Sequence, residues 1–257
     1  MLILQEQKKQ MQQNSIGHKI LWVDVVDSTN DRASVLAKDP LTHGVVVATP
    51  FQKAGRGQRG NHWESAHGQN LLFSVILKPH FLEVQKQFLL SKAVALSLND
   101  VLADMVNGVS IKWPNDIYVN NKKVAGILIE HSFSTAMLDT SIVGVGLNVN
   151  QAKFAGSIPN PTSLMLEKGN EHDVKKLLGV ICDAFDKRYS QLFYDEKGIS
   201  DSYIDRLYRY GKYFSFKAGD NVFIAKITGV RSSGELVLET PDGKFHEYAF
   251  KEIEYVF

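Results

Sequence analysis

The stretch KWPNDIYVNNKKVAGIL, residues 112–128, alternates short aliphatic segments with turn residues. Together with the preceding VSI it predicts three neighbouring strands, over 109–113, 116–119 and 123–131. Asn120 and Asn121 separate the last two strands, and we expect a tight hairpin there because asparagine tolerates a positive φ angle. Aliphatic runs bounded by turn residues predict further strands over 19–26, 44–50, 70–79 and 140–149.

Helices are predicted between these strands. Ser28 and Asp31 have the spacing of a capping box, which predicts a helix directly after the first strand. Apolar residues recur with a helical period over 84–106 and 173–193, which predicts two long amphipathic helices. The single cysteine, Cys182, lies in the second of them, and we expect it to be a small buried apolar side chain.

The pattern changes after about residue 210. Short alternating segments are separated by turns at 218–220, 232–234 and 241–243, which predicts a small all-β barrel over 211–257. We therefore expect a larger domain over 18–210, followed by the barrel. A glutamine-rich tail over 1–17 precedes both, and we expect it to be poorly ordered.

Composition excludes several classes of protein. The net charge is +1, from 29 basic and 28 acidic residues, so no excess of positive charge favours binding to nucleic acid. One cysteine excludes a disulfide framework and a multi-cysteine zinc site, and the eight histidines are too scattered to complete a metal site. No signal peptide or membrane span is predicted, and we expect a cytoplasmic protein.

GRGQRG, residues 55–60, matches the pattern G-x-G-x-x-G of dinucleotide-binding turns. The polar NHWESAHGQN that follows does not predict a helix, and the next strand ends in Lys78-Pro79 rather than in an acidic residue, so the dinucleotide interpretation fails. A P-loop is excluded because no Lys-Ser or Lys-Thr pair follows the glycines. What remains is either a loop that binds a carboxylate or phosphate through Arg56 and Arg59, or an ordinary surface loop.

Four motifs, in this order, resemble the biotin protein ligase family: DSTN (27–30), QKAGRGQRGNHW (52–63), the stretch over 112–128 and VGVGLNVN (143–150). The resemblance extends more loosely into the C-terminal barrel. It implies an α+β fold, in which a mixed β-sheet flanked by helices, similar to class II aminoacyl-tRNA synthetases, is followed by a small SH3-like β-barrel.

The resemblance also implies an AMP-forming, ATP-dependent ligase. Such an enzyme converts biotin and ATP, with Mg²⁺, to biotinyl-5′-AMP. It then transfers biotin to one lysine of a carrier domain of a carboxylase or decarboxylase, such as the biotin carboxyl carrier protein of acetyl-CoA carboxylase. The residues before the first predicted strand are too few for a helix-turn-helix domain, so we expect no repressor function. We expect a monomer or homodimer that binds neither nucleic acid nor a membrane.

Site residues are implied by the resemblance, position by position. The implied catalytic residues are Arg56, Lys123, Lys112 and Asp116. The implied biotin contacts are Ser28, Thr29, Asn30, Gln52, Arg56, Gly57, Gln58, Lys123 and Gly126. The implied ATP and adenylate contacts are Gly55, Arg56, Gly57, Arg59, Trp63, Asn115 and Asn148.

Elementary chemistry suggests roles for some of these residues. Adenylation joins two anions, so we expect Arg56 and Lys123 to place positive charge where the carboxylate meets the α-phosphorus. Hydroxyl and amide groups of the DSTN motif and of Gln52 suit the ureido ring of biotin, which has one acceptor and two donors. Asp116 is a candidate base for the second step, and Trp63 is either an adenylate contact or an apolar plug under the loop.

The loop departs from the family pattern at two positions. Gln58 stands where the family commonly has arginine, and Asn61 stands where a basic residue is frequent. Each exchange removes a positive charge near the expected phosphate, so we predict that adenylate leaks from the site. Two rival functions stay open: a lipoate–protein ligase, which shares the fold and the chemistry, and a non-catalytic module that senses biotin or adenylate.

Overall fold

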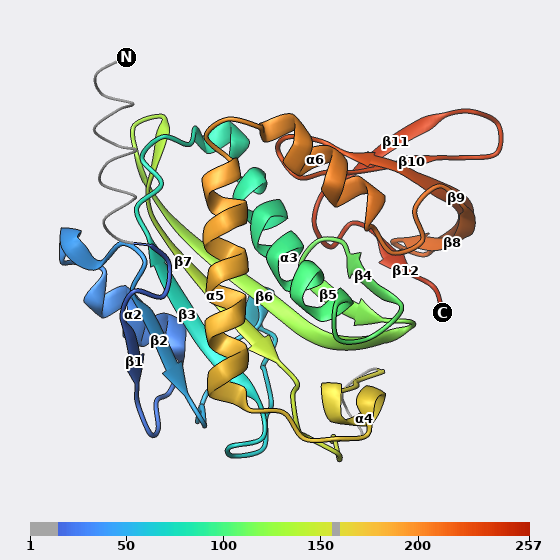
Figure 1. The fold of residues 1–257 in the computed structure, drawn as a ribbon. Helices are drawn as coiled ribbons and strands as arrows, with labels where there is room; N and C mark the ends of the chain where they lie inside the picture. Colours follow the sequence, from blue (N-terminus) through green and yellow to red (C-terminus); the bar gives the residue numbers. More distant parts are fainter. Residues whose placement is uncertain (1–14, 156–159) are drawn as a thin grey trace.

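The computed structural model describes residues 15–155 and 160–257 of the chain (Figure 1). Most of the tail expected over 1–17 lies outside the described residues. Ile16 is buried, and its backbone N–H donates to the carboxylate of Asp186 at 2.8 Å. The N–H of Gly17 donates to the carbonyl of Gly44 at 2.8 Å. The described part of the tail is thus packed against the main body.

The larger part of the fold is a seven-stranded mixed sheet. Its strand order is β1-β2-β3-β7-β6-β5-β4, with β1 parallel to β2 and the other neighbours antiparallel. The strands are β1 (Ile20–Trp22), β2 (Val46–Thr49), β3 (Leu71–Leu77), β4 (Val109–Lys112), β5 (Asp116–Val119), β6 (Lys122–Ser134) and β7 (Met137–Leu147). Each segment predicted as a strand in this region overlaps an observed strand, although β6 and β7 extend beyond the predicted ranges. Asn120 turns the β5–β6 hairpin with a positive φ of 54°.

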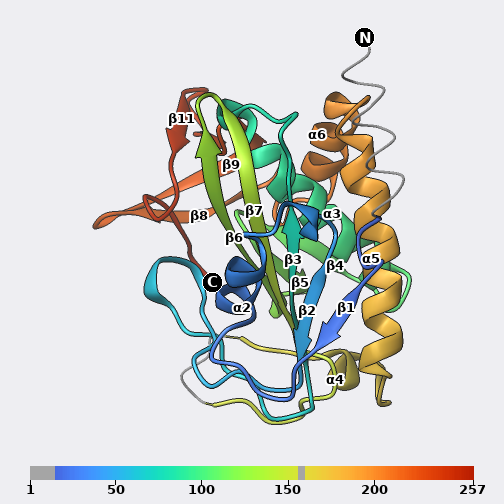
Figure 2. The ribbon, with the colours of Figure 1, turned by 90° about the vertical axis from the view of Figure 1, so that its left-hand side faces the viewer.

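Helices cover both faces of this sheet. α3 (Phe88–Ala103) and α5 (Val174–Gln191) lie on one face and α2 (Thr29–Leu36) on the other, as Figures 1 and 2 show. β3 runs between the two layers: Phe73 and Val75 join the core that includes α3 and α5, while Ile76 joins a smaller core with Ala33 of α2. Burial on both faces explains why β3 is a nearly continuous apolar run.

The C-terminal region forms a separate five-stranded antiparallel sheet of order β11-β10-β9-β8-β12. Its strands are β8 (Tyr213–Ala218), β9 (Asn221–Val230), β10 (Leu236–Glu239), β11 (Phe245–Tyr248) and β12 (Glu254–Tyr255), and the predicted turns lie between them. Phe216 and Leu238 of this sheet belong to the same apolar core as Phe73. The indole N–H of Trp113 donates to the carbonyl of Gly234 at 2.8 Å, so the two sheets are joined by a specific contact as well as by apolar packing.

Some local predictions differ from the structure. The sequence pattern does not predict the helices α4 (Leu164–Lys168) and α6 (Glu196–Asp205), and a 3₁₀ turn over Val84–Lys86 precedes α3. Ser28 does occupy the N-cap of α2, but its hydroxyl makes no capping hydrogen bond. Asp31, the other member of the predicted capping box, forms an ion pair with Arg56 instead. No described helix is long and apolar enough to cross a membrane.

Candidate active site

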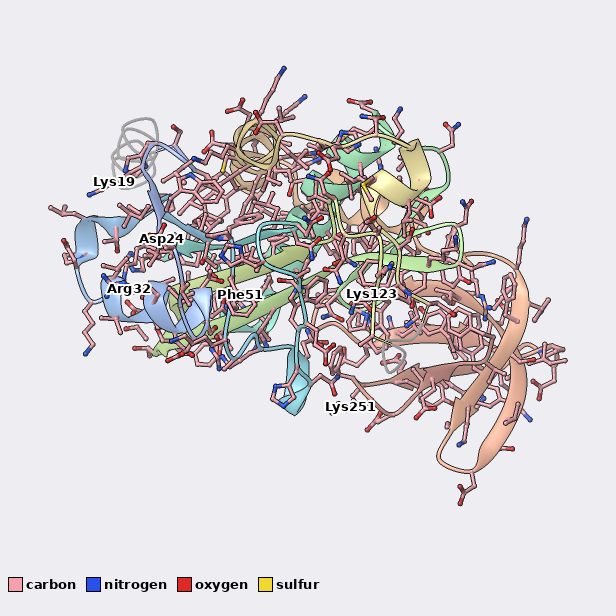
Figure 3. All side chains as sticks on the ribbon, turned by 90° about the horizontal axis from the view of Figure 1, so that it is seen from below. Lys19, Asp24, Arg32, Phe51, Lys123 and Lys251 are labelled. Carbon is pink, nitrogen blue, oxygen red and sulfur yellow. The ribbon has the colours of Figure 1, made fainter. Side chains whose placement is uncertain are left out.

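A cavity of about 790 Å³ lies beside the glycine–arginine loop, which we define as residues 52–63. The loop, strands β5, β6 and β7 and the C-terminal segment 250–255 all contribute to its walls. Lys123, at the start of β6, and Lys251, from the C-terminal segment, both line it and are labelled in Figure 3. The cavity therefore lies at the junction of the two sheets.

Most of the residues predicted for the site line this cavity. They are Ser28, Thr29, Asn30, Gln52, Arg56, Gly57, Gln58, Trp63, Lys112, Asn115, Asp116, Lys123 and Gly126. Gly55 and Asn148 are outside the lining, and the side chain of Arg59 lies outside the described part of the structure. Motifs that are far apart in the sequence thus meet in one place.

Buried hydrogen bonds form one end of the cavity. The backbone N–H of Thr29 donates to the side-chain oxygen of Gln52 at 2.8 Å. The hydroxyl oxygens of Thr29 and Ser74 are 2.7 Å apart, and Ser74 donates to Oδ1 of Asn30 at 2.6 Å. Ser28 is buried, and because its hydroxyl makes no capping bond it is available to a ligand. This end of the cavity therefore offers hydroxyl and amide groups to a small polar ring.

The indole of Trp63 packs against glycines of the main sheet. An added Cβ would lie 2.3 Å from the indole at Gly146 and 3.0 Å from it at Gly126, so a side chain at Gly146 would displace the ring. The base of the loop is equally tight, since a Cβ at Gly55 would lie 2.4 Å from the carbonyl oxygen of Trp63. This packing matches the apolar plug that was one of the two roles considered for Trp63. The indole N–H is buried without a partner among the described residues.

Two amide side chains brace the backbone around the cavity. Asn115 donates to the carbonyl of Ile127 in β6 at 2.7 Å. Asn148 donates to the carbonyl of Thr162 at 2.9 Å. Thr162 also donates its backbone N–H to the carbonyl of Lys123. Both predicted residues therefore hold protein segments together in this structure.

Two lysines bring positive charge to the cavity in different ways. Lys123 forms an ion pair with Asp116 at 2.6 Å, although the contact lacks hydrogen-bond geometry at the carboxylate oxygen. The ammonium of Lys112 lies 4.6 Å from the ring centre of Tyr255 and forms no ion pair with any carboxylate among the described side chains. Burial lowers the pKa of Lys112, and the nearby charge of Asp116 opposes that shift.

Arg56 is held by two carboxylates. Its Nη2 is 2.8 Å from Asp31 and 2.6 Å from Glu130. No sequence motif marks Glu130, which follows the stretch 112–128 by two residues in β6. The alternation of side chains along a strand could have indicated Glu130, because it lies on the same face of β6 as the predicted site residue Gly126.

The C-terminal segment supplies further lining residues that were not predicted from the sequence. They are Phe250, Lys251, Ile253, Glu254 and Tyr255. No motif marks this segment, since its contacts depend on how the second sheet packs against the first. Gly144 and Gly146 were missed as well, although glycines at alternate positions of a predicted strand leave one face bare.

Comparison with known proteins places this chain in a family. Residues 22–148 match the model of the biotin/lipoate A/B protein ligase family. The biotin–[acetyl-CoA-carboxylase] ligase of Paracoccus denitrificans is 33% identical over 226 residues, which cover 85% of this chain and 93% of that protein. The bifunctional ligase/repressor BirA of Bacillus subtilis is 32% identical over 236 residues, covering 89% and 71%.

A solved structure extends the comparison to the whole fold. The biotin protein ligase from Aquifex aeolicus in complex with biotin and ATP superposes with a TM-score of 0.78 at 27% identity, covering 93% of this chain and 100% of that one. The agreement includes the C-terminal sheet, because the coverage extends well beyond the residues of the family model. The chain therefore belongs to the biotin/lipoate A/B protein ligase family.

Proposed function

We propose that this protein is a biotin–protein ligase, which activates biotin with ATP and transfers it to a lysine of a carrier protein. One observation carries the proposal: a single cavity combines a buried hydroxyl and amide end with the basic side chains of Arg56, Lys112 and Lys123. The hydroxyl and amide end suits a neutral polar ring, and the basic side chains suit the negative charges of a carboxylate and of ATP. The names of the relatives support the same activity.

In the first step, a carboxylate oxygen of biotin attacks the α-phosphorus of ATP and pyrophosphate leaves. Both reactants are anions, so fixed positive charge at the point of contact lowers the barrier. We assign this role to Arg56, Lys123 and Lys112. Ser28, Thr29 and Gln52 would bind the ureido ring and so orient the carboxylate toward the phosphorus.

We also propose that Mg²⁺ takes part in the reaction as an ion bound to ATP. The described residues contain no group of three or more His, Cys, Asp or Glu side chains that could hold a metal ion. Mg²⁺ commonly binds to substrate phosphates with one or two carboxylates. We therefore propose that it arrives on the phosphates of ATP, with Asp116 and Glu254 as the carboxylates that line the cavity.

In the second step, the amine of the carrier lysine attacks the acyl carbon of biotinyl-5′-AMP, AMP leaves, and the nitrogen loses a proton. We propose Asp116 as the group that accepts this proton. Its ion pair with Lys123 means that an Asp116→Asn variant must be tested in both steps. Normal transfer of preformed adenylate by this variant would eliminate the role.

The proposed architecture has two functional domains. Residues 18–210 would form the catalytic domain, whose sheet we compare with that of class II aminoacyl-tRNA synthetases. Residues 211–257 would form an SH3-like barrel that closes one side of the cavity. The partner would be the biotin-accepting carrier domain of a carboxylase or decarboxylase. This protein would bind it as a monomer or homodimer.

The decisive experiment is ATP–pyrophosphate exchange with Mg²⁺, run with biotin, with lipoate and with neither. We expect exchange with biotin alone and its loss in a Lys123→Met variant. Exchange with lipoate alone would keep the chemistry but overturn the contacts assigned to the ureido ring. Binding of biotin without any exchange would favour the sensor module over the ligase.

A further inference from the structure

Glu130 connects two parts of the cavity that the mechanism treats separately. It lies on β6 outside the cavity lining, and one of its carboxylate oxygens, Oε2, accepts two hydrogen bonds. One comes from the side-chain amide of Asn30 at 2.7 Å and the other from Nη2 of Arg56 at 2.6 Å. A shared charged acceptor fixes both donors relative to each other.

Asn30 is fully engaged by protein groups on this side. Its Nδ2 also approaches the carbonyl of Leu128 at 3.4 Å, and its Oδ1 accepts from Ser74. The side chain is 3% exposed, and a Cβ at Gly144 would lie 2.2 Å from Oδ1, so the amide has no room to turn. Since both N–H groups of its amide donate to protein acceptors, Asn30 mainly stabilises the polar end of the cavity rather than contacting a ligand there.

Arg56 links this support to the loop. Backbone hydrogen bonds close the loop on itself, from Trp63 to Gly55 at 2.9 Å and from Gly57 to Asn61 at 2.7 Å. The guanidinium of Arg56 then joins the closed loop to Glu130 and, at 2.8 Å, to Asp31 on α2. The loop over the cavity is therefore tied to the sheet by a side chain and not only by its ends.

We propose that Glu130 is a positioning residue: it holds the glycine–arginine loop over the cavity through Arg56 while it holds Asn30 beneath the polar end. The inference rests on the proposed function for the identity of the ligand. It assigns Glu130 to ligand binding and retention, since the carboxylate does not line the cavity and reaches the reacting groups only through Arg56.

Glu130→Gln is the central variant, because glutamine keeps an acceptor for Asn30 but loses the charge that binds Arg56. Asp31→Asn is the matched control, since Asp31 pairs with the same guanidinium nitrogen, whereas the side-chain amide of Asn30 donates to Glu130. The side chain of Asp31 is 57% exposed, against 38% for Glu130, and Glu130 also accepts a hydrogen bond from the buried Asn30, so the ion pair of Asp31 contributes less. We expect Glu130→Gln to raise the dissociation constant of biotin about tenfold and Asp31→Asn to raise it less than about threefold.

Two further measurements separate positioning from general loss of structure. Trypsin should cut the loop faster in Glu130→Gln than in Asp31→Asn, while the thermal midpoints of both variants should change little. Glu130→Asp, which keeps the charge, should recover part of the affinity. Equal affinity and equal cleavage in the two variants would overturn the proposal.

A double-variant cycle tests the route through Arg56. In an Arg56→Ala background, Glu130→Gln should raise the dissociation constant of biotin by less than about threefold, because the partner of the lost charge is absent. A persistent tenfold effect there would refute positioning of the loop through Arg56. If the unaltered protein binds no biotin, the proposed function fails, while the trypsin comparison still tests the role of Glu130.

Discussion

At the scale of single residues, Gln58 is one of the two positions at which the loop departs from the expected family pattern. Its side-chain oxygen is buried and has no hydrogen-bond partner in the described part of the structure. Gln58→Arg would add a charge-assisted contact to the phosphate, and such contacts contribute about 1.5–3 kcal/mol. We expect the variant to release biotinyl-adenylate roughly tenfold more slowly, measured by rapid filtration of the loaded enzyme.

Gln58→Met provides the control for that experiment, since it preserves the length of the side chain without a charge. Its release rate should be no slower than that of the unaltered protein. An unchanged release rate in Gln58→Arg would show that the loop does not limit retention of the adenylate.

We expect Lys112 to give the reaction a dependence on pH. Burial lowers its pKa, so its ammonium loses its proton at a lower pH than an ordinary lysine, whose pKa is about 10.4. Biotin-dependent exchange should therefore decline on the alkaline side as this charge disappears. Lys112→Arg should move the decline to higher pH in a profile of kcat, and an identical alkaline limb in both proteins would exclude Lys112 as its cause.

Site residues that belong to a recognisable sequence motif could be predicted from the sequence. Ser28, Thr29, Gln52 and Lys123 follow from the resemblance and line the cavity. Glu130 could not be selected in the same way, because its importance comes from Asn30 and Arg56, which reach it from other parts of the chain. The direction of the Arg56 guanidinium, toward two carboxylates, is likewise a property of the folded molecule.

At the scale of secondary-structure elements, Gly146 of β7 and Gly126 of β6 create the bare surface on which Trp63 lies. Gly146→Ala would place a methyl group 2.3 Å from the present position of the indole. The ring must then move into the cavity or leave it, so we expect biotin affinity to fall at least about tenfold, measured by calorimetry. The free energy of unfolding should also decrease, by about 1–3 kcal/mol.

Gly179, in α5, is the matched control for this substitution. It has a normal helical environment with no atom within 4 Å of an added Cβ. Gly179→Ala should increase the free energy of unfolding by about 0.5–1 kcal/mol, because alanine loses less entropy in a helix, and it should leave biotin affinity unchanged. Equal affinities for the two alanine variants would contradict the packing role of Gly146.

Elements with a marked pattern of apolar residues could be predicted from the sequence, whereas elements with few apolar residues could not. β3 and α5 stand out as apolar runs or stripes because they are buried by their neighbours. α6 has few apolar residues and contains Gly198, and its start depends on Asp195, which accepts a hydrogen bond from that glycine at 2.8 Å. Such a helix is stabilised by a cap and by packing on α3 rather than by its intrinsic preference.

At the scale of the whole molecule, one apolar core includes both sheets. Phe216, Ile227 and Leu238 belong to the same cluster as the core of the main sheet. We therefore expect a single cooperative unfolding transition in urea, with coincident curves from far-UV circular dichroism and from hydrogen exchange of the C-terminal strands. Separate transitions would show that the C-terminal sheet is stable by itself.

The presence of the second sheet was predictable, but its place was not. Alternating segments and turns indicate antiparallel strands after residue 210, as the structure confirms. The contact of Trp113 with Gly234 and the position of Tyr255 over Lys112 join segments that are more than 100 residues apart. No local pattern encodes such long-range contacts, so the C-terminal wall of the cavity emerges only from the fold.

The packing of Trp63 also has an optical consequence. Its indole is one of three in the chain, its N–H is buried, and the residue lines the cavity that a ligand would fill. Indole emission responds to the polarity around the ring, so the arrival of a ligand changes the colour and intensity of the light that this side chain emits. The protein thus carries a built-in fluorophore at its own cavity, and occupancy can be followed in real time without attaching a dye.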